Sequence, residues 1–389
     1  MGDMMRIFNT RTGVKEFFIP QDPFEVKVYV CGPTVYDLCH VGHARTYVNF
    51  DVLKRYLTSL GYNVIHVQNF TDIDEKIDHR AKKEGLSPRE VAERFIMEYF
   101  FDMDSLNVTR ATRYTKASEY VPKIIKITER LLELGYAYRS GDAIYFDVEG
   151  AGGFGELVRD LKSAIVDEVR ASGKRGPFDF VLWRITGEGF ESPFGRGVPG
   201  WHTECVAMSM DNLGEVLDIH WGGKDLIYPH HECEALIAKA LTGKRFVKYW
   251  VHNEFVLLKG QKMSKSSGER AYIRDVLKRY SAEVLRTWIL SSNYREKIEF
   301  SEESLRKAQL LYEKISRAAT KARGNEGMGQ CAKDYAELFM SALDDDLETG
   351  QALSVVEELS DRVLEGKIEG AWRIFSLVES VLGIKIRPH

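Results

Sequence analysis

The chain contains 389 residues, which is enough for two or three domains of ordinary size. Its 54 Lys and Arg residues and 58 Asp and Glu residues give a net charge of −4, which excludes a protein that binds polyanions over its whole surface. Hydrophobic residues make up 44% and charged residues 29% of the chain, so intrinsic disorder is excluded as its main state.

Nothing in the sequence indicates export or membrane insertion. No apolar run approaches the ~18 residues that a spanning helix needs. The N-terminal residues lack the hydrophobic region of a signal peptide. An odd number of thinly spread cysteines favours reduced thiols or metal ligands over a disulfide framework. We therefore expect a cytoplasmic protein with no membrane segment, and its cysteines are Cys31, Cys39, Cys205, Cys233 and Cys331.

Residues 27–70 predict a strand–helix–strand unit. The apolar run 27–31 predicts a buried strand, and residues 64–67 predict the next one. Between them, apolar residues recur at helical spacing as far as Leu60, and Gly61 is placed to end the helix. A crossover of this size implies parallel strands with ligands beyond their carboxyl ends, so residues 32–43 are placed for chemistry.

Further elements follow along the chain. A capping box at Ser87-Pro-Arg-Glu90 predicts a helix start. Residues 149–200 are rich in glycine and poor in periodicity, so we expect an insertion there rather than part of the core framework. From Ser301 onward only helical patterns occur, broken at 324–329, which predicts a helical bundle. The remaining predicted elements are a helix at 122–134, a strand at 143–148, a strand at 216–221 and a helix at 232–241.

Two histidines flank a glycine in His40-Val-Gly-His43, where the first strand gives way to a helix. The free N–H groups and dipole of a helix N-terminus attract anions, and Gly42 would let a ligand approach closely. The pattern favours a polyphosphate site, although an isolated HxGH fits a pair of helix-capping loop histidines equally well. The strand–turn–helix context favours the functional interpretation.

A second candidate for phosphate chemistry is the loop Lys262-Met-Ser-Lys-Ser266, followed by Ser267-Gly268. Lys262 and Lys265 would stabilise charge on a departing pyrophosphate. Such a loop on its own is usually a solvated turn. Its occurrence after HxGH in the same chain makes the pattern much more specific.

A metal site is indicated by a group of histidines, cysteines and glutamates. His230 and Glu234 are four residues apart, so on a helix that starts after Pro229 they share one face. Cys205 and the strand-end Cys31 would complete a tetrahedron of two thiolates, one imidazole and one carboxylate, which suits zinc.

Spacing alone leaves alternatives to this ligand set. His231 and Cys233 are rival ligands in the same segment. The thiols also fit buried, unligated cysteines. Cys39 and Cys331 are interpreted as structural.

These motifs belong to a longer series of short segments. The series is Cys31-Gly-Pro-Thr-Val-Tyr-Asp37, His40-Val-Gly-His43-Ala-Arg45, Asn69-Phe-Thr-Asp-Ile-Asp-Glu-Lys76, Pro199-Gly-Trp-His-Thr-Glu-Cys205, Tyr228-Pro-His-His-Glu-Cys-Glu234, Lys262-Met-Ser-Lys-Ser266 and Asp344-Asp-Asp-Leu347. In type and in order, these segments resemble those of the cysteinyl-tRNA synthetases. The similarity runs from about residue 5 to the end of the chain.

The resemblance implies a class I synthetase of the α/β class, with a Rossmann-like nucleotide-binding domain built on a parallel sheet. It also implies an inserted connective region and a C-terminal helical bundle. The boundaries that we expect are 1–115 and 201–255 for the two halves of the catalytic domain, 116–200 for the insertion, 256–322 for the lysine loop and stem-contact region, and 330–389 for the bundle.

The same resemblance implies the functional residues. The ligands of one Zn2+ map onto Cys31, Cys205, His230 and Glu234, and the metal would bind the thiol of the substrate. The cysteine pocket would contain Gly32, Thr71, Trp201 and Asp225, with Asp225 pairing with the α-amine. His40, His43 and Lys265 would hold the phosphates of ATP, which binds with Mg2+, and Lys262 would assist. The implied partners are L-cysteine, ATP and tRNA(Cys), and we expect a monomer.

Two segments depart from the family pattern. The lysine loop continues Ser267-Gly-Glu269 where the family commonly has Leu-Gly-Asn. The chain stops at His389, after the bundle, where relatives continue into a small mixed domain that helps to read the anticodon. We therefore expect that domain to be absent and the C-terminus to be shortened.

Two alternative functions are considered. An ATP-dependent ligase that joins cysteine to an amino sugar in thiol-cofactor synthesis would share the catalytic core and the zinc pocket. Residues 32–35, 232–234 and 344–347 resemble the tRNA enzyme more closely. A non-catalytic RNA-binding paralogue is disfavoured because HxGH, both loop lysines and all four metal ligands are present.

Overall fold

The structure is a computed structural model, and it describes residues 5–158, 173–262, 271–323 and 330–386. A five-stranded parallel sheet forms the centre, in the order β11-β10-β3-β4-β5. The expected parallel sheet is confirmed, and it combines strands from two distant parts of the chain. These strands are β3 (Glu25–Val30), β4 (Asn63–Phe70), β5 (Arg113–Lys116), β10 (Leu217–Gly223) and β11 (Val247–Asn253).

The helix α1 (Val41–Ser59) crosses over between β3 and β4, as predicted, and most of its side chains are buried. It starts earlier than the apolar periodicity suggests, because His40 caps its N-terminus. The predicted capping box at Ser87 is confirmed at the start of α3 (Pro88–Ser105). Around the sheet lie α2 (Glu75–Glu84), α5 (Trp201–Leu213), α6 (Glu232–Thr242) and the hairpin of β1 (Arg6–Asn9) and β2 (Val14–Phe17).

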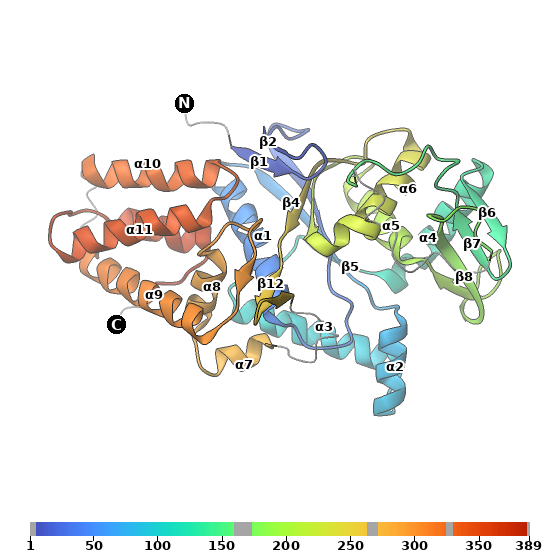
Figure 1. Cartoon of the computed structure of the whole chain (residues 1–389), viewed down its shortest axis with the longest axis horizontal. Coiled ribbons are helices and arrows are strands. Elements are labelled where there is room, and N and C mark those ends of the chain that lie inside the picture. Colours follow the sequence, from blue (N-terminus) through green and yellow to red (C-terminus); the bar gives the residue numbers. More distant parts are fainter. Residues whose placement is uncertain (1–4, 159–172, 263–270, 324–329, 387–389) are drawn as a thin grey trace.

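The insertion between the two halves of the sheet contains regular secondary structure. It contains an antiparallel sheet in the order β6-β7-β8-β9, seen beside α4 in Figure 1. The strand β8, which lies within 149–200, was not predicted. Glycines inside β8 hid its alternation, and pairing with β7 and β9 fixes the strand. The elements are α4 (Ala117–Glu133), β6 (Ala137–Ser140), β7 (Ala143–Phe146), β8 (Phe180–Phe190) and β9 (Gly197–Pro199).

The C-terminal part of the described chain is helical, as predicted, and lies on the other side of the central sheet from the insertion (Figure 1). A small sheet in the order β13-β12-β14 lies along the chain between β11 of the central sheet and the helix α9. The predicted break at 324–329 lies outside the described residues. The elements are β12 (Val256–Leu258), β13 (Gln261–Lys262), α7 (Ile273–Leu277), α8 (Ala282–Leu290), β14 (Ile298–Glu299), α9 (Glu302–Ala322), α10 (Gln330–Asp344), α11 (Thr349–Leu364) and α12 (Trp372–Leu377).

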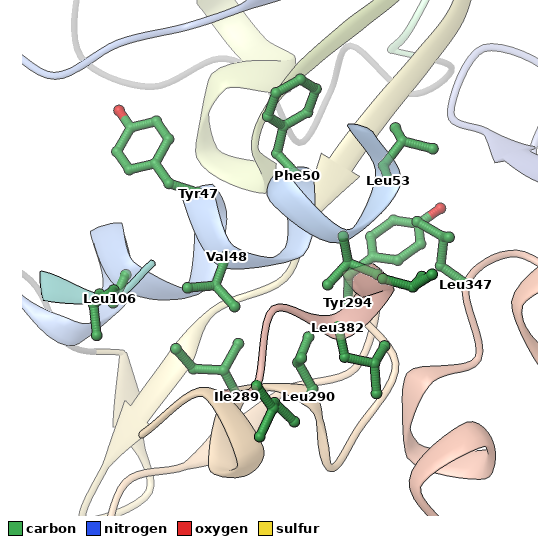
Figure 2. Packing of buried hydrophobic residues seen from close by; sticks show 14 of the residues in the cluster. Tyr47, Val48, Phe50, Leu53, Leu106, Ile289, Leu290, Tyr294, Leu347 and Leu382 are labelled. Carbon is green, nitrogen blue, oxygen red and sulfur yellow. The ribbon is translucent and has the colours of Figure 1, made fainter. Parts of the chain in front are cut away.

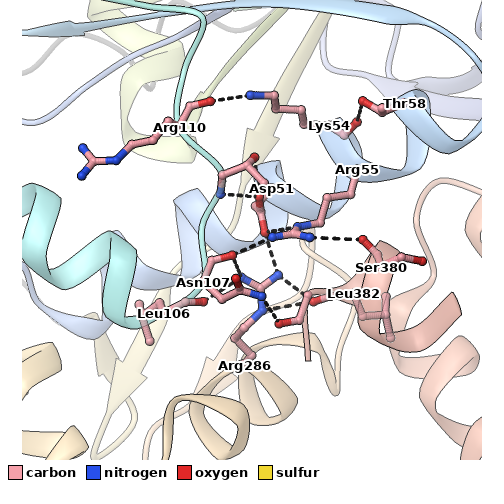
Figure 3. Close-up of polar contacts among 12 residues, drawn as sticks. Asp51, Lys54, Arg55, Thr58, Leu106, Asn107, Arg110, Arg286, Ser380 and Leu382 are labelled. Carbon is pink, nitrogen blue, oxygen red and sulfur yellow. Dashed lines mark hydrogen bonds and ion pairs between the residues drawn. The ribbon is translucent and has the colours of Figure 1, made fainter. Parts of the chain in front are cut away.

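A shared core joins these helices to α1. Figure 2 shows Val48 of α1 facing the apolar side chains of α8 and the C-terminal Leu382, all within one buried cluster. At its edge, the buried guanidinium of Arg286 contacts the Asp51 carboxylate at 2.8 Å and donates to the Leu382 carbonyl at 3.0 Å (Figure 3). Arg286 of α8 thus links the C-terminal segment to α1, the helix that carries the HxGH motif.

The acidic motif at 344–347 forms a second joint. Asp346 is fully buried and accepts hydrogen bonds from the Phe8 amide at 2.7 Å, the Tyr294 hydroxyl at 2.7 Å and Arg295 Nε at 2.6 Å. It therefore ties the N-terminal hairpin to the segment that follows α8, which is a structural role. In the part of the chain that the structure describes, no helix is long and apolar enough to cross a membrane.

Candidate active site and metal centre

The predicted site residues gather at one edge of the central sheet. Cys31 follows β3 directly, Thr71 follows β4, and Asp225 lies in a helical turn just after β10. The carboxyl ends of these parallel strands meet at that edge, which is where α/β sheets bind ligands. These residues are up to 200 positions apart in the sequence, but the parallel sheet brings them together in space.

Four buried side chains converge there as the sequence predicts. The donor atoms of Cys31, Cys205, His230 and Glu234 all lie within 4.8 Å of one another. The two sulfur atoms are 4.0 Å apart, and His230 Nε2 lies 2.9 Å from Glu234 Oε1. The helical pairing expected for His230 and Glu234 is confirmed at the start of α6, while Cys205 comes from α5.

These donors suit a zinc ion. Two sulfur atoms, one imidazole nitrogen and one carboxylate oxygen form an ordinary tetrahedral set for zinc. Oε1 of Glu234 is buried, and its close polar neighbour is His230 Nε2 of the same donor set, as expected of two groups that would share a metal. Of the two rival ligands, His231 belongs to a second possible group with Cys31, His220 and Glu234, whereas Cys233 belongs to neither group.

The charges in this cluster also favour a cation. The hydrogen bond from Cys31 lowers the pKa of the Cys205 thiol to about 6, although burial opposes this shift. Burial and the neighbouring Cys205 raise the pKa of Cys31. Burial alone would raise the pKa of Glu234, but His230 and His220 outweigh it and lower the pKa to about 2. Burial alone would lower the pKa of His230, but Glu234 and Cys205 outweigh it and raise the pKa to about 10. One thiolate and one carboxylate are therefore ready as ligands at neutral pH, and a metal would displace the proton of His230.

A chain of hydrogen bonds behind Cys31 was not predicted. His231 Nε2 lies 3.4 Å from Cys31 Sγ, and His231 Nδ1 lies 2.7 Å from His252 Nε2. His252 Nδ1 in turn lies 2.7 Å from the Thr10 hydroxyl. Burial lowers the pKa of His252 to about 3, so the ring is neutral. Neutral rings with one donor and one acceptor orient a metal-binding thiol without adding charge.

Two more histidines orient the other ligands. His220 Nε2 lies 3.0 Å from Glu234 Oε2, and His202 Nδ1 lies 3.0 Å from His230 Nδ1. The ring of Trp201 stacks on His230 with centroids 4.1 Å apart, and its side chain is 44% exposed. Trp201 therefore covers the metal-binding residues from the solvent side, where a substrate would enter.

The glycine and threonine at the strand ends are held in place by close backbone contacts. A Cβ at Gly32 would lie 1.6 Å from the Asn69 carbonyl oxygen, and the Gly32 amide donates to Asn69 Oδ1 at 2.8 Å. Thr71 is buried, and its amide donates to the Pro33 carbonyl at 3.2 Å. Only glycine lets β3 and β4 end this close together.

Gly32→Ala is therefore expected to push the ends of β3 and β4 apart and to displace Cys31. We expect a loss of stability of about 1–3 kcal/mol, as for an overpacked core, and at least a tenfold loss of metal affinity. Thermal unfolding and a metal titration would measure the two effects. Thr34→Ala, which adds no atom in the same segment, is the control. A Gly32→Ala variant with wild-type metal affinity would contradict the expectation.

The HxGH motif forms the N-terminus of α1. His40 Nδ1 accepts from the Gly42 amide at 3.1 Å, His43 Nδ1 accepts from the His40 amide at 3.2 Å, and the two rings stack at 3.9 Å. A Cβ at Gly42 would lie 2.8 Å from the His40 ring, so glycine makes room for this cap. The expectation of free amides is corrected here, because the Val41 and Gly42 N–H groups already donate within the protein.

The lysine loop starts from a short hairpin and ends beside this motif. Lys262 pairs with Leu257 in the short β12–β13 hairpin. After the loop, the Ile273 amide donates to the Cys39 carbonyl at 3.0 Å, and the Val41 amide donates to the Ala271 carbonyl at 2.9 Å. Residues 263–268 of the motif, including Lys265, lie outside the described residues.

Comparisons with known proteins agree with this architecture. Residues 17–310 match the family model described as "tRNA synthetases class I (C) catalytic domain". Among solved structures, the chain is similar to Mycobacterium tuberculosis methionyl-tRNA synthetase in complex with methionyl-adenylate, with a TM-score of 0.72 and 15% identity over 92% of each chain. At that identity the likeness concerns the fold. The fold and the family model together define a class I aminoacyl-tRNA synthetase.

Curated relatives identify the family within this class of synthetases. The chain is 44% identical to the cysteine–tRNA ligase of Geobacter sulfurreducens, over 94% of this chain and 81% of that protein. It is 41% identical to the cysteine–tRNA ligase of Pyrococcus horikoshii, over 98% of this chain and 86% of that protein. The chain belongs to the cysteine–tRNA ligase family, and it is an enzyme of the ligase class.

Proposed function

We propose that this enzyme activates L-cysteine with ATP and Mg2+ and transfers it to the 3′ end of tRNA(Cys). The relatives named as cysteine–tRNA ligases support the joining of cysteine to tRNA. The observation that carries the finer proposal is the buried cluster of Cys31, Cys205, His230 and Glu234 at the carboxyl edge of the sheet. This cluster stands where the side chain of a bound amino acid would lie.

The cluster would select the substrate by its sulfur. Rejecting serine by a factor of about 10^4 requires about 5.5 kcal/mol. The one-atom difference in shape supplies only ~1–3 kcal/mol. Held by the four ligands, one Zn2+ would bind the substrate thiolate and leave a hydroxyl weakly bound, because soft sulfur ligands suit it better.

The remaining pocket residues would orient the amino acid. Trp201 stacks on His230 and would cover the bound side chain. Asp225 is exposed beyond the end of β10 and would pair with the α-amine. Gly32 and Thr71 would line the floor, where the close approach of β3 and β4 keeps the backbone in place.

The phosphates of ATP would bind at the N-terminus of α1. His40 and His43 stack there and would contact the phosphates through their rings, since the neighbouring amides are already engaged. Lys265 would reach the departing pyrophosphate, with Lys262 assisting from the end of β13. The cysteine carboxylate would attack the α-phosphate in line, so catalysis consists of positioning and charge stabilisation.

We also propose the division of the chain that the sequence suggests. Residues 1–115 and 201–255 would form the catalytic domain, 116–200 the insertion, 256–322 the stem-contact region and 330–389 the bundle. The enzyme would act as a monomer, with the insertion and the bundle binding the tRNA.

Attachment of labelled cysteine to total tRNA, with ATP and Mg2+ present, tests the proposal. We expect charging that unlabelled cysteine suppresses and that serine at a thousandfold excess does not. Exchange of pyrophosphate into ATP that depends on cysteine should accompany it. Exchange without charging would point to the ligase that joins cysteine to an amino sugar. The absence of both exchange and charging would refute the proposal.

A further inference from the structure

A buried glutamate that the site has not yet used lies between two of the proposed metal ligands. Glu232 is the first residue of α6, and its side chain is completely buried. Its carboxylate accepts hydrogen bonds from four consecutive backbone amides of the insertion. Oε1 accepts from Gly155 at 2.7 Å and Glu156 at 2.9 Å, and Oε2 accepts from Leu157 at 2.6 Å and Val158 at 3.0 Å.

Helix geometry places this carboxylate on the side opposite the metal ligands. His231 and Glu232 have helical backbone angles, and successive side chains on a helix are 100° apart. His230 and Glu234 each stand two residues from Glu232, so both point about 200° away from it. The first turn of α6 is therefore held on one face by the metal-binding cluster and on the other by residues 155–158.

The same loop packs against the segment that precedes the ligands. The ring of Phe154 meets the ring of Tyr228 edge-on, with centroids 5.7 Å apart. Tyr228 lies two residues before His230. The loop thus contacts the segment that carries the ligands on both sides of His230. Phe154 contacts Tyr228 before it, and after it the amides of residues 155–158 bind the Glu232 carboxylate, an arrangement that we call the clamp.

We propose that Glu232 is a positioning residue of the metal centre, which fixes the orientation of His230 and Glu234 by anchoring the first turn of α6 to residues 155–158 of the insertion. This inference rests on the proposed zinc site. It assigns the insertion a part in holding the metal. A carboxylate is required at this position because both oxygens must accept, and the carboxamide of glutamine accepts with only one.

Glu232→Gln tests the inference in the zinc-loaded protein. The variant places an NH2 group against two of the four amides, so the clamp opens on one side. We expect zinc to pass to a chromophoric chelator about tenfold faster than from the wild type, as for other residues that orient metal ligands. Hydrogen exchange of the peptide that contains residues 155–158 should quicken as well. Glu215→Gln, which removes an exposed ion pair with Lys244, is the matched control.

A second variant reaches the clamp from the other side. Gly155 has φ +141° and open space where a Cβ would lie, so Gly155→Ala strains the loop backbone without touching α6. We expect faster zinc release from this variant also. If Glu232→Gln does not fold, Gly155→Ala alone tests the proposal. Faster exchange at 155–158 with wild-type zinc release in both variants would overturn the positioning role. Unchanged exchange would show that the carboxylate does not hold the loop.

Failure of the proposed function gives a different result. If the wild-type protein binds no zinc, the metal site is refuted, and the exchange at residues 155–158 still reports on the clamp. If the wild type binds zinc and neither variant releases it faster, only the role of Glu232 is refuted.

Discussion

Cys205→Ser is expected to remove bound zinc and the activation of cysteine together. The hydrogen bond from Cys31 lowers the pKa of the Cys205 thiol to about 6, so Cys205 supplies the thiolate of the cluster at neutral pH. A serine hydroxyl stays protonated there and is a poor ligand for zinc. We expect zinc content below a tenth of the wild-type value and at least a hundredfold loss of pyrophosphate exchange that depends on cysteine.

Cys233→Ser provides the control for this experiment. Cys233 is also buried and lies on α6 between the ligands, but it belongs to neither four-donor group among the described residues. The control should retain one zinc per chain, measured by atomic absorption on dialysed protein. Full cysteine activation by zinc-free Cys205→Ser would contradict the role of the metal in selecting the thiol.

The second large effect concerns the joint between α1 and the C-terminal helices. Arg286→Met is expected to lower the free energy of unfolding by about 3–5 kcal/mol, because it breaks a buried ion pair and leaves Asp51 with less compensation. It also removes donors from the Leu382 and Leu106 carbonyls. Urea unfolding followed by circular dichroism would measure the change.

An exposed ion pair offers the comparison. Arg89→Met breaks the pair with Glu93, in which Arg89 is 86% exposed, and we expect a change below about 1 kcal/mol. Equal effects of the two substitutions would show that the Arg286 joint contributes no more than a surface pair.

The ion pair between Asp51 and Arg286 also predicts how the stability of the protein depends on pH. Burial alone would raise the pKa of Asp51, but Arg286 and Arg55 outweigh it and lower the pKa below its usual value. The ionised group therefore stabilises the fold above its unfolded pKa of about 4, and this contribution is lost as the pH falls through the folded pKa. Wild-type stability should fall more steeply below pH 4 than that of Arg286→Met.

The sequence predicted the main architecture because local patterns were consistent with the fold. The apolar run before Gly32, the helical periodicity after His43 and the capping box at Ser87 all correspond to elements of the structure. The strand β8 was missed because glycines interrupt it and tertiary pairing fixes it. Periodicity cannot report a contact that only the partner strand supplies.

The candidate site was predicted only in part from spacing. His230 and Glu234 lie one helical turn apart, a relation that spacing shows directly. Cys31 and Cys205 were added as thiolates that would complete a zinc set, and only the resemblance favoured them over His231 and Cys233, since 174 positions separate the two cysteines. The histidines behind the cluster and the clamp at Glu232 carried no local signal. The amides that Glu232 binds lie 74–77 positions before it, and Cys31 lies 200 positions before His231, so only the folded chain brings such residues together.

The strand order of the central sheet also affects how the protein is made. β3 lies between β4 and β10, yet β10 is synthesised roughly one hundred residues after β5. At ~5–20 residues per second, ribosomes need about 5–20 s to produce that stretch. During this interval the backbone groups on one edge of β3 have no partner strand and are open to pairing with other nascent chains. Bringing Cys31 next to Cys205 therefore exposes the growing polypeptide to aggregation, which makes shielding by chaperones valuable during translation.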